Sequence, residues 1–349
     1  MNKIPVIILG ATGIVGQRFI QMLADHPWFE IVGLVGSERS SGSHYGEAVN
    51  WVITGDPPGD ICDMQVLPLD AELPGRLAFS ALPAKIAKTY EPMLAEKGFI
   101  VCSNASAFRL APDVPMIIPE VNHQHLSILD QQKKTRGWKG LLVTSPNCTT
   151  TGMVMPLKPL HDTWQVDRIS VVSFQAISGA GYPGASYLDT SDNMIPYIPG
   201  EEEKLGAETR ALLGSVSKGS RMDAEIIVSA QANRAPILHG HTVCLSVGFK
   251  QKPSSQQAID LLKNYQPSEI VRRLPSAPAH PLILTEDPSR PQPRRDRDTE
   301  KGMSVTVGRL RGCPLLDLRL VSVVHNAIRG AAGGSILNAE LLVEMGYLQ

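Results

Sequence analysis

The chain begins with short apolar runs that alternate with segments of helical periodicity. Residues 5–9 form an apolar run typical of a buried strand, and residues 14–24 place apolar side chains on one face of a helix. A second strand is expected at 30–36, which completes one strand–helix–strand unit. Further strands are expected at 77–81, 99–102 and 141–143. This alternation predicts an α/β fold with a parallel, doubly wound sheet of the Rossmann type.

The pattern changes after residue 148. Segments typical of strands follow at 169–175, 224–230, 243–250 and 315–324, joined by irregular connections that contain Gly and Pro. They predict an α+β second domain with a more antiparallel sheet. Residues 255–265 are typical of an amphipathic helix, and 275–301, rich in Pro, Arg and Asp, of a long ordered excursion or an interface arm.

The last segment, 333–348, returns to helical periodicity and is expected to pack back on the first domain. We therefore expect a dinucleotide-binding domain at 1–147, completed by a C-terminal helix within 328–349. The second, catalytic domain is expected at 148–327.

The composition and net charge of the chain argue against several classes of protein, such as nucleic-acid-binding and membrane proteins. The 349 residues are 43% apolar, enough for two folded domains, and the net charge of −1 leaves no electrostatic footprint for nucleic acid or an anionic membrane. No apolar run approaches the roughly 18 residues that span a bilayer, and the first strand begins too early for a signal peptide. Five scattered cysteines without a C-x-x-C pair fit a reducing compartment. We expect a cytoplasmic protein with no nucleic-acid or membrane partner.

A glycine-rich turn separates the first strand from the first helix. Glycines at 10, 13 and 16 let backbone N–H groups approach a pyrophosphate at a helix N-terminus, and this strand–turn–helix placement is the context that the dinucleotide motif requires. The alternative is a tight turn that binds nothing. The residues expected to contact the cofactor are Gly10, Thr12, Gly13, Ile14, Val15 and Gly16.

The end of the second strand bears on the choice of cofactor. An acidic residue at this place usually holds the ribose hydroxyls of NAD, whereas NADP needs hydroxyls and a cation for its 2′-phosphate. Ser37, Arg39 and Ser40 could supply the latter, which favours NADP(H). Glu38 could instead face a ribose diol.

Cys148 stands where a buried strand gives way to a helix, in the run Ser-Pro-Asn-Cys-Thr-Thr. A helix N-terminus favours negative charge, so a thiol there is expected to ionise more readily, and the same N–H groups can hold an oxyanion. The position suits covalent acyl chemistry.

A cysteine nucleophile needs a proton shuttle, and His241, just before a β-rich segment, is the candidate among nine histidines. A metal site of His239, His241 and Cys244 is an alternative, but it lacks a second ligand cluster, so we expect no metal. Six other histidines lie in polar or turn-like settings and are expected at the surface: His26, His44, His123, His125, His161 and His280.

Four further segments carry polar residues near predicted strand or helix ends. Residues 103–109 follow a strand and suit anion contacts, and Asn104 and Arg109 among them are expected to bind the substrate. Residues 175–181 end a strand and enter a flexible loop, in which Ser178 and Gly179 are expected to contact the cofactor. Residues 201–204 could be a solvated charge run. Residues 325–330 precede the C-terminal helix.

Taken together, these motifs resemble those of the aspartate-β-semialdehyde dehydrogenase family, in the branch typical of archaea and fungi. The resemblance covers nearly the whole chain, and its specificity comes from the order and spacing of the motifs. They are G-A-T-G-I-V-G-Q, S-N-A-S-A-F-R, P-N-C-T-T, Q-A-I-S-G-A-G-Y-P-G, G-E-E-E-K, G-H-T, R-P-Q-P-R-R-D-R-D and H-N-A-I-R-G-A-A-G.

The resemblance implies a role for each matching residue. Cys148 matches the nucleophile, His241 the acid–base group and Gln175 a residue that positions the substrate. The remaining matches concern binding: Arg234 for the substrate α-carboxylate, Glu201 for its amino group, Arg109 and Lys204 for phosphate, and Asn326 for the nicotinamide. Ser145 and His239 depart from the residues frequent in the family, which puts fine substrate tuning in doubt rather than the chemistry.

The resemblance also implies a semialdehyde dehydrogenase-type catalytic and dimerisation domain, a homodimer or homotetramer, and a step in lysine, threonine and methionine synthesis. The reaction would be the NADPH-dependent reductive dephosphorylation of L-aspartyl 4-phosphate to L-aspartate 4-semialdehyde through a Cys148 thioester. Alternatives are a malonyl-CoA reductase or another acyl reductase of this fold, such as N-acetylglutamyl-phosphate reductase. A non-catalytic NADP-binding redox sensor is a different class, since fold alone does not define function.

Overall fold

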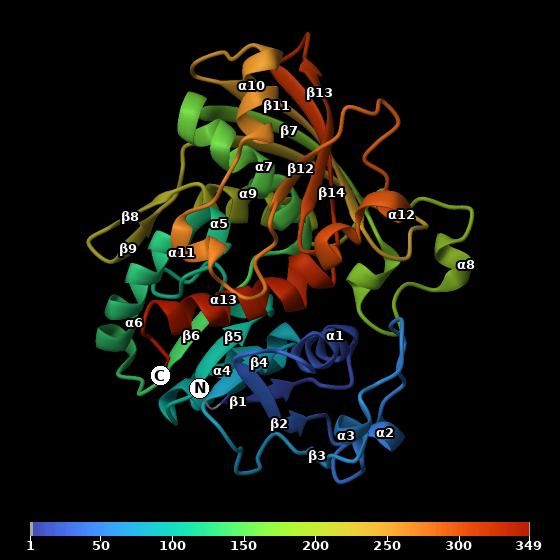
Figure 1. Ribbon diagram of the computed structural model, residues 1–349, viewed down its shortest axis with the longest axis vertical. Helices are drawn as coiled ribbons and strands as arrows, with labels where there is room; N and C mark the ends of the chain where they lie inside the picture. Colours follow the sequence, from blue (N-terminus) through green and yellow to red (C-terminus); the bar gives the residue numbers. More distant parts are fainter. Residues whose placement is uncertain (1–2, 349) are drawn as a thin grey trace.

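The first part of the chain forms a parallel sheet. The computed structural model describes residues 3–348, and its first sheet has six parallel strands in the order β3–β2–β1–β4–β5–β6 (Figure 1). The strands are β1 (Ile4–Leu9), β2 (Phe29–Val35), β3 (Val66–Leu67), β4 (Leu77–Ser80), β5 (Ile100–Ser103) and β6 (Leu141–Thr144). The predicted doubly wound sheet is confirmed.

Helices cover both faces of this sheet because its strands are apolar on both sides. Along β1, Val6 and Ile8 join the core beneath α1 (Ile14–Leu23), whereas Ile7 and Leu9 join the core beneath α4 (Ala84–Glu96). The remaining helices of this part are α2 (Tyr45–Ala48), α3 (Gly59–Cys62), α5 (Pro119–Asn122) and α6 (Ile128–Arg136), with short 3₁₀ turns at Ser106–Phe108 and His123–Ser127.

The strand order reverses direction between β1 and β4, which are neighbours in the sheet but not in the sequence. Loops leaving two such strands diverge to opposite faces, and the crevice between them is where doubly wound folds bind ligands. The glycine turn follows β1, so the fold places it at this crevice.

The second sheet is mixed, with three antiparallel and two parallel strand pairs, which confirms the expectation of a more antiparallel second sheet. Its order is β10–β7–β11–β14–β13–β12, with β10–β7 and β12–β13 parallel and the other pairs antiparallel. The strands are β7 (Val166–Gln175), β10 (Ile227–Arg234), β11 (His241–Phe249), β12 (Leu282–Leu284), β13 (Val305–Gly312) and β14 (Leu318–Val324), and a separate hairpin pairs β8 (Ser215–Ser217) with β9 (Ser220–Met222).

Helices cover one face of this sheet through a separate apolar core, to which α7, α9 and α10 contribute. The helices in this part are α7 (Cys148–Trp164), α8 (Tyr187–Thr190), α9 (Glu201–Leu212), α10 (Ser255–Lys263), α11 (Glu269–Arg272) and α12 (Pro293–Asp296), with 3₁₀ turns at Ile177–Ala180 and Thr299–Gly302. The excursion at 275–301 is ordered and supplies β12 and α12. The residue-148 domain boundary stays a prediction.

Four strand ends meet at one edge of the second sheet. Gln175 ends β7 and pairs with Arg234, the last residue of β10, because these two strands are parallel. His241 begins β11, which runs antiparallel to β7, and pairs with Val324 at the end of β14. Asn326 follows two residues later. The topology therefore gathers residues that are far apart in the sequence at a single edge.

The C-terminal segment returns to the first sheet. After β14 a π-helical turn (Ile328–Ala332) leads into α13 (Gly333–Glu344). Figure 1 shows α13 crossing the molecule between the two sheets, where it contacts β5 and α1 and adds apolar residues to the first core. Glu340 anchors it, accepting hydrogen bonds from the Ser276 N–H and from His26 Nε2 at 2.8 Å.

Two histidine predictions were wrong. His26 and His125 are 4% and 5% exposed instead of lying at the surface. His26 accepts the N–H groups of Trp28 and Phe29 at Nδ1, and His125 contacts Asn122, so local polar partners compensate for burial. Among residues 3–348, no helix combines the length and apolar character needed to cross a membrane.

Candidate active site

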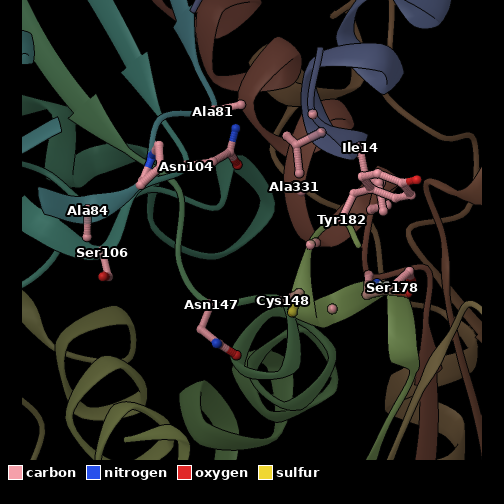
Figure 2. A pocket seen from close by; sticks show the side chains of 18 of the residues that line it. Ile14, Ala81, Ala84, Asn104, Ser106, Asn147, Cys148, Ser178, Tyr182 and Ala331 are labelled. Carbon is pink, nitrogen blue, oxygen red and sulfur yellow. Dashed lines mark hydrogen bonds between the residues drawn. The ribbon is translucent and has the colours of Figure 1, made fainter. Parts of the chain in front are cut away.

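A pocket of about 460 Å³ opens between the first sheet and the gathered edge of the second. Figure 2 shows Cys148 facing this space from the first turn of α7, with Ile14, Tyr182 and Ala331 on one side and Asn104 on another. The predicted site residues that line it are Gly13, Ile14, Val15, Asn104, Arg109, Cys148, Ser178, Gly179, Lys204 and Asn326. Gln175, Glu201, Arg234 and His241 are buried beside it, through the contacts described below.

The glycine turn has the shape of a phosphate cradle. Gly10 has φ +76°, and a Cβ at Gly16 would lie 2.3 Å from the Gly10 carbonyl oxygen, so both positions require glycine. Gly13 is the N-cap of α1 and caps it with no side chain, which leaves the first N–H groups of the helix facing the pocket region. The Thr12 carbonyl accepts from Gln17 Nε2 and steadies the turn. These features fit a dinucleotide pyrophosphate.

The turn after β2 lies beside the glycine turn, because β1 and β2 are parallel neighbours in the sheet. Ser37 and Arg39 are exposed there, as an anion site requires, and so is Glu38. Ser40 is buried, and its hydroxyl donates to the Ser37 carbonyl at 3.1 Å. Ser40 therefore shapes the turn, and its hydroxyl proton is not free for a ligand in this conformation.

Cys148 and His241 form the central contact, with Sγ and Nε2 3.1 Å apart. α7 begins at Cys148 because Asn147 caps it, its side-chain oxygen accepting the N–H groups of Thr149 and Thr150. The Ala176 N–H donates to His241 Nδ1 at 2.9 Å. This contact assigns the neutral imidazole a proton on Nε2, which points at the sulfur.

The electrostatics at Cys148 differ from those expected at a helix N-terminus. Burial raises the pKa of the thiol to about 12, and the Glu201 carboxylate adds to the rise, while Arg109 and a hydrogen bond from Thr149 oppose it. Burial, with the Arg234 charge, also lowers the pKa of His241 to about 3. In this state the pair is a thiol and a neutral imidazole rather than an ion pair, so helix position alone does not form a thiolate.

Glu201 is the hub of one polar cluster. One of its oxygens accepts from Asn147 Nδ2 at 2.8 Å and from Gln175 Nε2 at 3.3 Å, and the other from Lys204 Nζ at 2.7 Å. Residues 201–204 form the first turn of α9, in which Glu203 is exposed but Glu201 is 7% exposed and faces the site, so Glu201 is not part of a solvated charge run.

Arg109 is held by a residue that the sequence analysis missed. Its Nη1 donates to Glu208 at 3.0 Å and its Nη2 to the Asn104 carbonyl at 2.7 Å. Glu208 also accepts the Asn147 N–H at 2.6 Å and is 1% exposed. The sequence could have indicated Glu208 through its spacing, because it follows Glu201 by two helical turns and therefore lies on the same face of α9.

Arg234 lies behind the loop that carries Gly179. Its Nη1 donates to the Ala176 carbonyl at 2.7 Å, and no ion-pair partner is found for it in the described part of the chain. Burial lowers its pKa. A Cβ at Gly179 would lie 3.0 Å from His241 Cε1 and 3.1 Å from Arg234 Nη1, so only a residue without a side chain fits here comfortably.

Ser178 and Asn326 belong to a second polar cluster on the pocket wall. Asn326 Nδ2 donates to Ser178 Oγ at 2.9 Å, and Asn326 Oδ1 accepts the Gly240 N–H. His239 Nδ1 lies 2.9 Å from Ser178 Oγ, so this histidine is engaged with a hydroxyl. No group of three or more His, Cys, Asp or Glu side chains placed to hold a metal ion is found within residues 3–348.

The fold and the pocket thus define a two-domain α/β protein in which a dinucleotide-type crevice opens onto a cysteine–histidine pair. Two family models match the chain: "Semialdehyde dehydrogenase, NAD binding domain" over residues 5–129, and "Semialdehyde dehydrogenase, dimerisation domain" over 157–329.

Full-length relatives agree with these models. An aspartate-semialdehyde dehydrogenase of Archaeoglobus fulgidus is 47% identical, with 97% of each chain covered. A crystal structure of aspartate semialdehyde dehydrogenase with NADP from Candida albicans is 39% identical over 98% of this chain and 99% of that one, with a TM-score of 0.91. A malonyl CoA reductase (NADP) of Metallosphaera sedula is 39% identical over 98% of this chain and 97% of its own.

The chain therefore belongs to the aspartate-semialdehyde dehydrogenase family. The resemblance predicted from the sequence motifs is confirmed, as are the dinucleotide-binding domain and the two-domain fold.

Proposed function

We propose that the protein catalyses the reversible NADPH-dependent reductive dephosphorylation of L-aspartyl 4-phosphate to L-aspartate 4-semialdehyde. The observation that carries this is the 3.1 Å contact between Cys148 Sγ and His241 Nε2, at a pocket shared by the glycine turn and by the cations Arg109 and Lys204. A nucleophile, a hydride-donor site and an anion site thus meet in one space, as this reaction requires.

In this proposal each charged side chain around the pocket binds one group of the substrate. Arg234, which lacks an ion-pair partner among the described residues, would take the substrate α-carboxylate in a bidentate pair. Glu201 would take the amino group, and Gln175 would help to orient the chain beside the thiol. Arg109 and Lys204, with Asn104, would receive the phosphate. Asn104 Nδ2 and Arg109 Nε are buried and have no partner in the structure, so both donors await a ligand.

Acylation begins at the sulfur. Sγ of Cys148 attacks the acyl carbon, the carbon–oxygen bond to phosphate breaks, and the thiol proton ends on the departing phosphate. The Cys148 N–H, which the Asn147 cap leaves out, would hold the oxyanion. His241 would stabilise the thiolate by donating its Nε2 proton in a hydrogen bond, because the Ala176 contact keeps Nδ1 as the acceptor.

Reduction uses the cofactor side of the same pocket. Gly13, Ile14 and Val15 would hold the pyrophosphate, the turn at Ser37 and Arg39 the 2′-phosphate, and Asn326, with Ser178 and Gly179, the nicotinamide. The cofactor, when bound, would supply a hydride to the thioester carbonyl carbon. The oxyanion so formed on Cys148 would reform its carbonyl group, breaking the carbon–sulfur bond and releasing the semialdehyde, while His241 Nε2–H would donate a hydrogen bond to the departing thiolate.

Substrate binding itself would activate the thiol. The Glu201 carboxylate contributes to the raised pKa of Cys148. A substrate ammonium beside Glu201 would neutralise that charge and lower the pKa of the thiol. The nucleophile would then form when the correct amino acid is present and stay protonated otherwise.

A second candidate is malonyl-CoA reduction, which the Metallosphaera sedula relative favours. Malonate also offers a carboxylate to Arg234, but it has no ammonium group for Glu201. The named relatives are enzymes, so no observation favours a redox sensor.

One assay separates the two candidates. We expect phosphate-dependent reduction of NADP with the semialdehyde, much weaker reduction of NAD, and no oxidation of NADPH with malonyl-CoA. Oxidation of NADPH by malonyl-CoA, without turnover of the semialdehyde, would instead assign the second function.

For the assembly and its setting, we propose a homodimer or homotetramer that buries the second domain, in keeping with the dimerisation-domain match. The enzyme would act in the cytoplasm, releasing inorganic phosphate, in the synthesis of lysine, threonine and methionine.

A further inference from the structure

Glu208 contacts two parts of the site, the cation Arg109 and the residue Asn147 that precedes the nucleophile. Its carboxylate has one oxygen on Arg109 Nη1 and the other on the Asn147 N–H, at 3.0 and 2.6 Å. Asn147 caps the helix that begins at Cys148, and Arg109 lines the pocket beside it. One buried side chain is thus bonded both to the cation and to the nucleophile's helix.

The Arg109 guanidinium is fixed by what lies behind it. Glu208 and the Asn104 carbonyl each take one of its N–H groups, while Nε has no protein partner although it is buried. A guanidinium has five N–H groups, so most of them stay available to an anion. Because the two anchors hold it at Nη1 and Nη2, the plane of the fork is set before any ligand arrives.

Glu208 does not line the pocket and is 1% exposed. It therefore acts through Arg109 and Asn147 rather than on a ligand. Glu201, on the same face of α9, accepts a hydrogen bond from the Asn147 side chain, and Glu208 accepts one from the Asn147 backbone N–H. Two residues of α9 therefore hold Asn147 in place. The two glutamates serve different sites, because Glu201 lies beside the proposed amino-group site and Glu208 beside the anion site.

We propose that Glu208 is the positioning residue for the phosphate site: it orients Arg109 and holds that cation in register with the Cys148 helix. This inference rests on the proposed function, in which Arg109 receives the phosphate. Glu208→Gln would keep the shape but lose the charge, leaving a buried Arg109 without its carboxylate.

The experiment measures NADP reduction by the semialdehyde at varied concentrations of inorganic phosphate. For Glu208→Gln we expect the phosphate KM to rise about tenfold or more, as for loss of a buried charge-assisted hydrogen bond. The KM for semialdehyde should stay within about twofold, because Arg234 and Glu201 are untouched. Glu208→Asp keeps the charge but is shorter, so the phosphate KM should lie between those of the wild type and Glu208→Gln.

Two controls make the result specific. Glu203→Gln removes the same charge from an exposed position of α9 and should leave the phosphate KM unchanged. In an Arg109→Met background, Glu208→Gln should raise the phosphate KM by less than about twofold, because a shared interaction is lost only once. If Glu208→Gln does not fold, the intermediate phosphate KM of Glu208→Asp decides the question.

An unchanged phosphate KM in a folded Glu208 variant, an equal rise in every KM, or full additivity with Arg109→Met would overturn the inference. These outcomes differ from failure of the proposed function, in which the wild-type protein itself shows no phosphate-dependent reduction of NADP.

Discussion

The two walls of the pocket are built from different materials. The cofactor wall is mostly backbone, a glycine turn between β1 and α1 whose helix carries no capping side chain. The substrate wall is a network of buried polar side chains, in which Glu201 and Glu208 each bond to Asn147. The first wall depends on the absence of side chains, whereas the second depends on exact partners.

The difference has a physical basis. Every dinucleotide presents the same pyrophosphate, which backbone N–H groups and a helix N-terminus can hold. An amino acid with a reactive acyl group needs a separate partner for each charge, and buried charges are stable only when paired or hydrogen-bonded. Substitutions on the cofactor wall should therefore impair cofactor binding or folding, whereas those on the substrate wall should alter the charge and reactivity of Cys148 and its neighbours.

The largest effect is expected from Cys148→Ser. A hydroxyl is a far weaker nucleophile than a thiolate, so kcat should fall by about a thousandfold or more while NADPH binding is retained. Steady-state assay and a cofactor fluorescence titration would measure the two properties. Turnover like that of the wild type would disprove the role of this residue.

On the cofactor wall, two neighbouring glycines should respond differently. A Cβ at Gly13 has its nearest atom at 3.5 Å, whereas one at Gly16 would lie 2.3 Å from a backbone oxygen. Gly13→Ala should keep the wild-type melting temperature and raise the KM for NADP about tenfold by crowding the phosphates. Gly16→Ala should lower the melting temperature as well. Equal stability of the two variants would contradict the described turn.

On the substrate wall, Glu201→Gln should make Cys148 more reactive toward alkylation although it impairs turnover. Removing the carboxylate lowers the pKa of the thiol, so at any pH below that pKa the thiolate fraction rises. We expect alkylation of Cys148 about three- to tenfold faster than in the wild type. In both proteins the rate should climb with pH above neutrality without a plateau. Slower alkylation of the variant would contradict the inference that the Glu201 carboxylate raises the pKa of Cys148.

The smallest effect on activity is expected at the C-terminal helix. Glu340→Gln weakens the contacts to Ser276 and His26, so unfolding should cost about 1–3 kcal/mol less. The kcat should not change, because Glu340 does not line the pocket. Glu344→Gln, exposed on the same helix, is the matched control for urea denaturation. A large fall in kcat with unchanged stability would count against a purely structural anchor.

The same contrast explains what the sequence could predict. The glycine turn, the parallel strands and the helix that begins at Cys148 follow from local patterns, and all three are present. The family motifs predicted residues that the fold then gathers, such as Gln175, Arg234 and His241 at one sheet edge. Pairing between distant strands brings them together, and no local signal gives that pairing.

Other features depended on tertiary surroundings. Glu208 was missed because its partners, Arg109 and Asn147, lie far away in the sequence. The thiol was expected to ionise readily, but burial and Glu201 raise the pKa of Cys148. His26 was expected at the surface and is buried against Glu340. In each case the property of the residue depends on a buried partner. Tertiary packing, rather than the local sequence, determines which residues are buried together.

A single-turnover experiment without phosphate shows directly whether Cys148 carries the acyl group. Semialdehyde and NADP are mixed with the enzyme, NADPH formation is followed, and the acid-quenched protein is mapped by mass spectrometry. The account predicts a burst of about one NADPH per site, an aspartyl thioester on Cys148, and its discharge when phosphate is added. Phosphate-dependent turnover with no burst, or with the acyl group on another residue, would contradict it.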